Sequence, residues 1–426
     1  MSRANPASHY TLYIQSIYPV ILETDKTNDN AKSVKLHRKI LKTTRNNMKK
    51  ESIHIVNFGP IKDVCIEDIK PFMVFIGESG SGKSTVVKVI ALFRWIYKMM
   101  CIRTFLKSSK IKKTYRFRMD TYLKNNEQDH FVKPTTRIEY RNGSITLVFE
   151  NNKLKGASVY VPKEELALEK IAFIADKRVC IPDLLTSHIS VRQRAFYMDD
   201  TFDEYLRATN VIKDLDIPYL GVKLEVRKTS NGVKHYVVSM DSKNPYRIEL
   251  VEASSGMQTT VPAHAIIEYY SRHYDLVEAI NKSVLSYVSA ADNWQSFKAT
   301  SNVGDFPNRR VSICLEEPEL SLFPDMQDRM MESVVNRMFN IEHNYSMSLL
   351  MTTHSPYIAN LINVLLREPK ESGINLPADV VDAYEMKDGE NRSLVANDQK
   401  QGIFIDLKLL SNEMKHNYQR YVELSR

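Results

Sequence analysis

The 426 residues are 43% hydrophobic and 26% charged, which is typical of a soluble protein with two or three domains. The first 50 residues hold ten of the 59 basic and three of the 51 acidic side chains. The net charge of +8 therefore falls to +1 over the remaining 376 residues and is weak evidence for nucleic-acid binding. No apolar run approaches the roughly 18 residues of a membrane-spanning helix, so no membrane contact is expected. The four cysteines include no C-x-x-C pair, which excludes a structural zinc site of the usual spacing and favours a reduced, cytoplasmic setting.

Residues 1–50 are predicted to form a basic N-terminal extension. They contain an apolar patch at 10–22 and then a polar, basic run, without the cationic start and continuous apolar core of a secretory signal. Met48 closely precedes an alternating run, 53–58, with which a domain would begin. Two interpretations stay open: the extension is a poorly ordered tail, or translation starts at Met48 and the extension is an artefact of start assignment.

A phosphate-binding loop is predicted between an apolar strand at 72–76 and a helix at 85–100. Segment 77–84 fits the pattern G-x-x-x-x-G-K-[ST], whose glycines let successive backbone N–H groups point at phosphate oxygens. Lys83 would bind the β and γ phosphates, and the Ser84 hydroxyl would coordinate Mg²⁺. The flanking strand and helix favour this interpretation over a chance pattern, so ATP and Mg²⁺ are the expected cofactors. The predicted nucleotide-binding residues are Gly77, Gly80, Gly82, Lys83, Ser84 and Thr85.

The region 101–249 is predicted to be an insert of mixed helices and strands. Alternation of apolar and polar residues predicts antiparallel strands over 137–150 and 222–249, with turns at their Asn-Gly pairs. Segment 103–118 holds seven basic residues with three aromatic residues interleaved. Such a patch could contact a nucleic-acid backbone, although a solvated loop or helix face is the commoner outcome.

Two consecutive carboxylates follow an apolar strand at 311–315. Glu316 would hold the Mg²⁺ ion and Glu317 would polarise the water that attacks the phosphate. A solvated acidic turn is the alternative, but the nearby phosphate loop favours the catalytic interpretation. A second strand, 349–353, delivers His354 to a strand end, where contact with a ligand is expected.

Three segments together resemble one family. Segment 316–324 looks like the E-E-P-E-x-x-L-x-P segment of ABC-type ATPases of the RecF, SMC and OLD-nuclease group, and 351–356 is similar to their T-T-H-S-P switch. Segment 253–258 resembles the ABC signature, although Ala253 replaces its leading leucine and Ser255 one of its glycines. The match covers 51–100 and 250–365, and no glutamine of the Q-loop type can be placed. Segment 171–178 resembles an I-P-A-E-R segment, in which Arg178 either contacts phosphate or a neighbouring subunit, or belongs to a surface charge cluster.

The resemblance implies an α/β fold, a P-loop ABC-type ATPase core split by a mixed α+β insert. The N-lobe would be 51–100 and the C-lobe 250–426, which carries the signature, the carboxylates and the switch histidine. The resemblance also implies sites completed between subunits, and hence a homodimer or higher oligomer. The nucleotide held by one subunit would meet the signature segment of another, whose binding residues would be Ser254, Ser255 and Gly256. The residues of the first subunit would be Lys83, Ser84, Glu316, Glu317 and His354.

Stand-alone ATPases of this kind resemble the ATPase subunits of bacterial anti-phage systems, which control a separate effector such as a nuclease or toxin. The last 48 residues, 379–426, offer no clustered acidic metal site, so no nuclease is expected within this chain. The insert is too short for the coiled-coil arm of SMC proteins. Two alternatives stay open: a DNA-dependent repair ATPase of the RecF or SMC kind, and a nucleotide-gated scaffold with little turnover.

Overall fold

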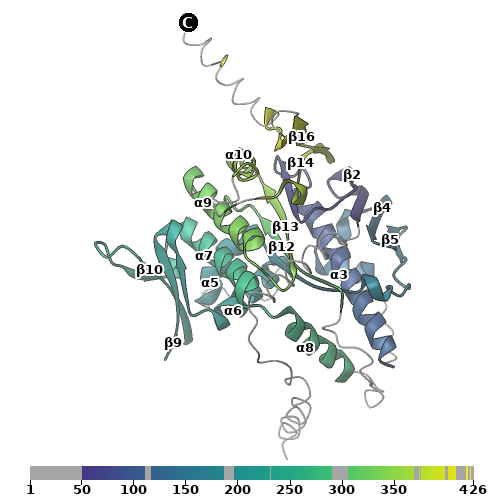
Figure 1. The fold of residues 1–426 in the computed structure, drawn as a ribbon, viewed down its shortest axis with the longest axis horizontal. Coiled ribbons are helices and arrows are strands. Elements are labelled where there is room, and N and C mark those ends of the chain that lie inside the picture. The colour runs from purple at the N-terminus through teal and green to yellow at the C-terminus, as the bar shows by residue number, and fades with distance from the viewer. Residues whose placement is uncertain are drawn as a thin grey trace, which may run out of the picture. The chain divides into compact units, whose positions relative to one another are not determined.

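An eleven-stranded sheet and a four-stranded sheet form the framework of the protein (Figure 1). The computed structural model describes residues 50–110, 117–186, 196–230, 232–289, 306–368, 374, 376–398, 402–408, 419–420 and 423. The described residues belong to one compact unit. Apart from Lys50, the predicted N-terminal extension lies outside the described residues.

The elements combine long buried strands with helices of very different lengths. The helices are α3 (Lys83–Ser108), α4 (Met119–Asn125), α5 (Ile181–Leu185), α6 (Phe196–Val211), α7 (Ser255–Glu268), α8 (Leu276–Ser289), α9 (Pro324–Val335) and α10 (Pro356–Leu365). The strands of the large sheet are β1 (Glu51–Phe58), β2 (Ile61–Ile66), β3 (Phe72–Gly77), β4 (Val132–Asn142), β5 (Ile145–Glu150), β6 (Lys153–Lys155), β7 (Ala167–Ile174), β12 (Asn308–Glu316), β13 (Ser346–Thr353), β14 (Val381–Lys387) and β15 (Glu390–Ser393). The remaining strands are β8 (Asp214–Ile217), β9 (Val222–Thr229), β10 (Gly232–Ser239), β11 (Arg247–Glu249), β16 (Val395–Asp398) and β17 (Gly402–Ile405).

The large sheet has a parallel half and an antiparallel half. Strands β14, β3, β13, β12 and β7 lie side by side and run parallel. Strands β6, β5, β4, β1 and β2 form the antiparallel half, and β15 joins the halves by pairing with β14 and β2. Parallel strands covered on both faces need near-continuous apolar sequence, and β3 meets this requirement because Phe72 to Ile76 are all buried. The α/β fold class is thus confirmed.

The region 101–249 divides between the two sheets. Strands β4–β6 extend the large sheet through the pairing of β4 with β1, and β7 lies at its parallel edge beside β12. Strands β8–β11 form the separate four-stranded antiparallel sheet. The predicted antiparallel pairs are confirmed as β4 with β5 and β9 with β10.

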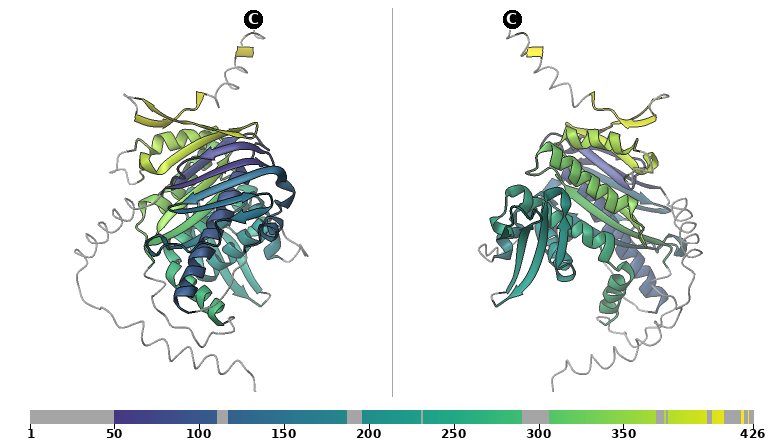
Figure 2. Two further views of the ribbon diagram at one scale, coloured as in Figure 1. Left: turned by 90° about the vertical axis from the view of Figure 1, so that its right-hand side faces the viewer. Right: turned by 60° about the vertical axis from the view of Figure 1, so that its left-hand side comes forward.

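Helices cover both faces of the parallel strands. Helix α3 lies on one face, and α9 and α10 lie on the other (Figure 2). Nineteen of the 26 residues of α3 are buried, so this helix is enclosed on nearly all sides rather than presenting one apolar stripe. Among the described residues, no helix combines the length and the apolar character needed to cross a membrane.

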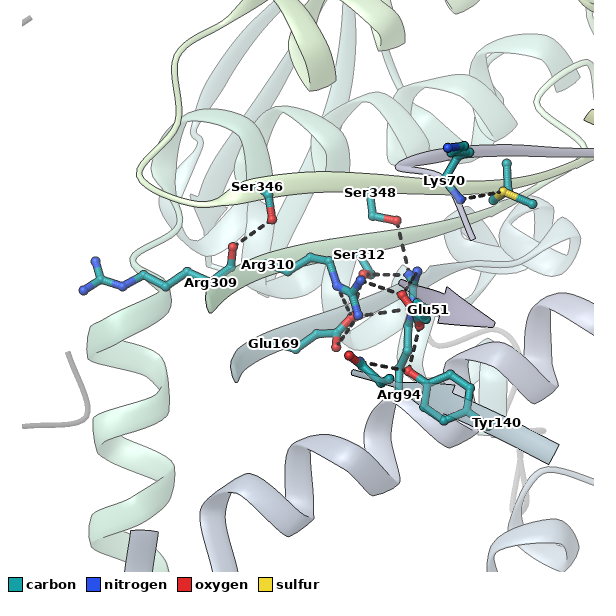
Figure 3. A network of polar contacts seen from close by, with 12 residues as sticks. Glu51, Lys70, Arg94, Tyr140, Glu169, Arg309, Arg310, Ser312, Ser346 and Ser348 are labelled. Atoms are coloured by element: carbon teal, nitrogen blue, oxygen red, sulfur yellow. Dashed lines mark hydrogen bonds and ion pairs between the residues drawn. The ribbon is translucent and has the colours of Figure 1, made fainter. Parts of the chain in front are cut away.

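A buried ion network fastens α3 to the sheet (Figure 3). Arg94 of α3 donates two hydrogen bonds to the Glu51 carboxylate, at 2.7 and 3.0 Å. Arg310 of β12 donates to Glu51 at 2.8 Å and to Glu169 of β7 at 2.9 and 3.0 Å. The Tyr140 hydroxyl of β4 completes the shell around Glu51 at 2.7 Å. Two cations and two anions share the site, so its charges balance, as buried charges require.

Glu51 is expected to make folding stability depend on acid pH. Burial alone would raise the pKa of Glu51, but Arg310 and Arg94 outweigh burial and lower it from 4.5 to about 2. Because this pKa is lower in the folded than in the unfolded chain, the ionised Glu51 carboxylate adds on the order of 3 kcal/mol to the free energy of unfolding above pH 4.5. This contribution is lost as the pH falls towards 2. Denaturant titrations over this range should show the loss in wild type and not in Glu51→Gln. Glu67→Gln, at an exposed glutamate, is the control, and an equal pH dependence in Glu51→Gln would contradict the assignment.

Candidate functional site

The predicted site residues from three segments lie at one edge of the parallel strands. In register, Thr353 of β13 pairs with Ile76 of β3, and Glu316 of β12 pairs with Thr352. Strand β7 ends beside them, since Ile174 pairs with Leu315. The carboxyl ends of parallel strands are where α/β proteins bind their ligands. The structure therefore brings together the glycine-rich loop, the two carboxylates and His354.

The loop between β3 and α3 requires glycine at three positions. A Cβ at Gly77 would lie 2.2 Å from the Met386 carbonyl oxygen of β14, so only glycine allows this approach. Gly80 and Gly82 adopt φ angles of +79° and +98°, which other residues rarely adopt. Gly82 immediately precedes Lys83, the first residue of α3. The loop thus curls directly into a helix N-terminus, where unpaired N–H groups favour an anion.

Lys83 is buried and folds back over this loop. Its Nζ donates to the carbonyl oxygens of Gly77 and Glu78, at 2.9 and 2.8 Å. Burial lowers the pKa of Lys83, while the negative charge of Glu317 acts in the opposite direction. The Lys83 ammonium therefore lies against the loop, and the negative charges of the segment that follows β12 act on it.

Glu316 has a buried oxygen suited to a metal ion. Its Oε1 has no hydrogen-bond partner among the described residues and lies 4.0 Å from Lys88 Nζ. Burial raises the pKa of Glu316, while Lys88 and a hydrogen bond from the Ser84 hydroxyl lower it. In the described part of the chain no three His, Cys, Asp or Glu residues gather to hold a metal. A hydroxyl and one carboxylate fit Mg²⁺, which is commonly bound by few protein oxygens together with phosphates and water.

Glu317 and His354 face each other across the end of the sheet. Glu317 Oε1 lies 3.4 Å from His354 Nε2, and each side chain is about one third exposed. Glu317 has a φ of +45°, a left-handed conformation that costs about 1–3 kcal/mol in a residue other than glycine. Its N–H donates to the Thr352 carbonyl oxygen at 2.9 Å. Strain of this kind persists only where surrounding contacts hold it, and it is common at functional sites.

Two further residues hold the segment around His354. Glu319 Oε1 accepts the His354 backbone N–H at 2.6 Å. Gln327 of α9 accepts from the Ser355 hydroxyl at 2.6 Å and donates to the Leu322 carbonyl oxygen at 3.0 Å. Neither residue is among the site residues expected from the sequence. Glu319 had one signal, its place as the third acid of the E-E-P-E run, whereas Gln327 is an ordinary polar residue on an amphipathic helix.

The predicted signature, 254–256, lies at the start of α7. Ser254 is its N-cap residue, and Ser254 and Ser255 are exposed. A Cβ at Gly256 would lie 2.9 Å from the Ser321 carbonyl oxygen, so this helix packs closely on the segment after the carboxylates. Among the described residues, no hydrogen bond or ion pair joins 254–256 to the glycine-rich loop of the same chain.

Arg178 is buried and does not belong to a surface charge cluster, whereas its contact with phosphate stays a prediction. Its side chain is 1% exposed, so it is not part of a surface charge cluster and is not available to a neighbouring subunit. Its guanidinium instead donates to backbone carbonyl oxygens of its own chain. The sequence does not indicate this role, because Arg178 directly follows Asp176 and Lys177 and looks there like one of several neighbouring charges.

The basic segment 103–118 is described only in part, because 111–116 lie outside the described residues. Arg103 is buried and donates to the Val159 carbonyl oxygen at 2.6 Å. Its guanidinium lies 5.1 Å from the Tyr160 ring centroid, and Lys107 Nζ lies 3.6 Å from the same centroid. These two cations are engaged by aromatic groups of their own chain, and nucleic-acid contact by this segment stays a prediction.

Comparisons with known proteins found distant similarity to solved structures. No family model and no curated protein matches the chain. The SMC head domain from Thermotoga maritima is 10% identical with a TM-score of 0.33, over 81% of this chain and 98% of that one. The recombination mediator RecF with ATP is 11% identical with a TM-score of 0.33, over 82% of this chain and 97% of that one. The ATP-binding cassette of an ABC transporter is 11% identical with a TM-score of 0.28, over 81% of this chain and 90% of that one.

At these identities and TM-scores, the chemistry of the site rests on its own residues. The described residues define an α/β protein with a glycine-rich loop between a buried strand and a long helix. Two acids and a histidine lie at the same sheet edge as that loop. This combination is typical of sites that bind and transfer phosphoryl groups.

Proposed function

We propose that this protein is an ABC-type P-loop ATPase that binds ATP with Mg²⁺ and hydrolyses it at the edge formed by β3, β13 and β12. One observation carries the proposal: the glycine-rich loop, Glu316, Glu317 and His354 meet at the carboxyl ends of adjacent parallel strands. A chance G-x-x-x-x-G-K-S sequence would not be expected to lie beside two carboxylates and a histidine brought there from more than 230 residues along the chain.

Each side chain has a role that follows from its position. Lys83 exchanges its hydrogen bonds with Gly77 and Glu78 for bonds to the β and γ phosphates. Ser84 and Oε1 of Glu316, an oxygen without a hydrogen-bond partner among the described residues, would hold Mg²⁺, and the ion would supply positive charge next to the phosphates. Glu317 accepts a proton from the attacking water. His354, 3.4 Å from Glu317, orients that carboxylate and reaches towards the γ-phosphate.

The site is proposed to be completed by a second copy of the chain. Ser254, Ser255 and Gly256 stand at the exposed N-terminus of α7, which offers hydroxyls and backbone N–H groups to an anion. We propose that these residues contact the γ-phosphate held by a partner's loop, so that ATP favours a homodimer or higher oligomer.

The finer biological role proposed is control of a separate effector protein in a bacterial anti-phage system. Its support is the resemblance of the quoted segments to stand-alone ATPases. A pull-down with a variant that retains ATP would identify the effector. ATPase activity that rises severalfold with added DNA would instead favour the DNA-dependent repair ATPase.

The ATPase proposal is tested with purified full-length protein. ATP binding is measured by equilibrium dialysis and phosphate release by a coupled assay, with Mg²⁺ and with excess EDTA. Saturable binding and Mg²⁺-dependent release of phosphate are expected. Absence of ATP binding at millimolar nucleotide would contradict the proposal, and binding without turnover would leave the nucleotide-gated scaffold.

A further inference from the structure

Arg178 is one of the largest fully buried side chains of the described residues, and no role in the ATPase has yet been given to it. It lies in a short 3-10 helix, Asp176–Cys180, that follows the end of β7. This position places it beside β12, where the Glu316 and Glu317 segment begins. A buried arginine at the edge of a proposed active site needs a physical reason, because removing its charge from water is costly.

The hydrogen bonds of Arg178 go to backbone carbonyl oxygens in three separate segments. Nη1 donates to Ala175 at 3.0 Å and to Glu316 at 2.7 Å. Nη2 donates to Glu317 at 2.6 Å, and Nε donates to Thr259 of α7 at 3.2 Å. Arg94, which is equally buried, binds a carboxylate instead. Arg178 thus binds main chain where a structural arginine such as Arg94 binds an acid.

Glu317 is the residue that most needs this support. Its φ of +45° is unfavourable for glutamate, and the following Pro318 restricts its backbone further. Its N–H donates to the Thr352 carbonyl oxygen, and its own carbonyl oxygen accepts from Arg178 at 2.6 Å and from the Leu320 N–H at 3.1 Å. With both polar groups of its backbone fixed, the Glu317 side chain is directed to His354.

We propose that Arg178 is a positioning residue for ATP hydrolysis, which holds Glu317 in its strained conformation and ties it to α7. The inference rests on the proposed ATPase function. Lysine cannot replace arginine here, because one ammonium cannot reproduce the planar fork that reaches several carbonyl oxygens at once. The same guanidinium contacts Thr259, and the Thr259 hydroxyl donates to the Leu320 carbonyl oxygen at 3.0 Å. Arg178 therefore also connects the Glu317 segment to the helix that begins at the predicted signature.

The central test is Arg178→Lys, compared with wild type and with Arg94→Lys as a control at an equally buried arginine. Arg178→Lys is expected to lower kcat at least tenfold while the Kd for ATP changes by less than about threefold. Hydrogen exchange of peptides covering 316–320 should accelerate in Arg178→Lys and not in Arg94→Lys. An unchanged kcat, or an equal loss of kcat in Arg94→Lys, would overturn the proposal.

A second comparison avoids substitution of Arg178 altogether. If Glu317 is held against its own preference, glycine should suit the position better than alanine, so Glu317→Gly should melt a few degrees above Glu317→Ala. Equal or reversed melting temperatures would show that no strain needs holding and would overturn the inference. Both the exchange and the melting measurements can be made without activity. If wild type does not hydrolyse ATP, the proposed function fails while these readouts still decide what Arg178 does to Glu317.

Discussion

Replacing Glu317 by glutamine is expected to stop ATP turnover while ATP remains bound. The amide has nearly the shape of the carboxylate but cannot take a proton from water, and a general base typically contributes between 10²- and 10⁴-fold to a rate. The phosphate contacts assigned to Lys83 and the glycine-rich loop are untouched, so the Kd for ATP should stay within a few-fold of wild type. Phosphate release measures the first effect and equilibrium dialysis the second.

The same variant also tests the proposal that ATP favours a dimer or higher oligomer. Because hydrolysis would normally release a subunit interface that ATP closes, Glu317→Gln with ATP should elute from size-exclusion chromatography as a larger species than the nucleotide-free protein. Glu390→Gln, at an exposed glutamate on β15, is the control and should retain wild-type turnover. Turnover that survives in Glu317→Gln would remove Glu317 from the proposed mechanism, and a wild type without turnover would favour the scaffold.

Features that depend on residues adjacent in the sequence are the easiest to predict from it. The loop from Gly77 to Ser84 is a local pattern whose spacing reflects how glycines turn a backbone and where a helix begins, and its φ angles and helix start agree with that expectation. Glu316, Glu317 and His354 could be placed at strand ends because apolar runs precede them. That they meet follows from the parallel order of β3, β13 and β12.

The interactions that sequence reasoning missed depend on tertiary contacts between distant segments. Nothing local indicates that β4 pairs with β1, or that Arg178 binds the carbonyl oxygens of Glu316 and Glu317. A hydrogen bond to a main-chain carbonyl oxygen cannot be predicted from residue type, because every residue has such an oxygen. Arg94 did carry a weak signal, because it is a charge between apolar residues on both sides, but its partner Glu51 lies 43 positions away. Sequence patterns therefore predict where the candidate site residues lie better than they predict the contacts that hold these residues.

Replacing Lys83 by alanine is expected to weaken ATP binding by about 100-fold, the upper range for loss of a charge-assisted hydrogen bond. The free energy of unfolding should change little. Burial disfavours the Lys83 charge, as its lowered pKa shows, and the ammonium donates hydrogen bonds only to the Gly77 and Glu78 carbonyl oxygens. Equilibrium dialysis with ATP measures the binding, and thermal melting confirms that the variant is folded. Lys62→Ala, at an exposed lysine of β2, should bind ATP as wild type does. If Lys83→Ala bound ATP with wild-type affinity, the glycine-rich loop would not be the phosphate site. The proposed roles of Glu317 and His354 would then fail as well, because both depend on a γ-phosphate bound at this loop.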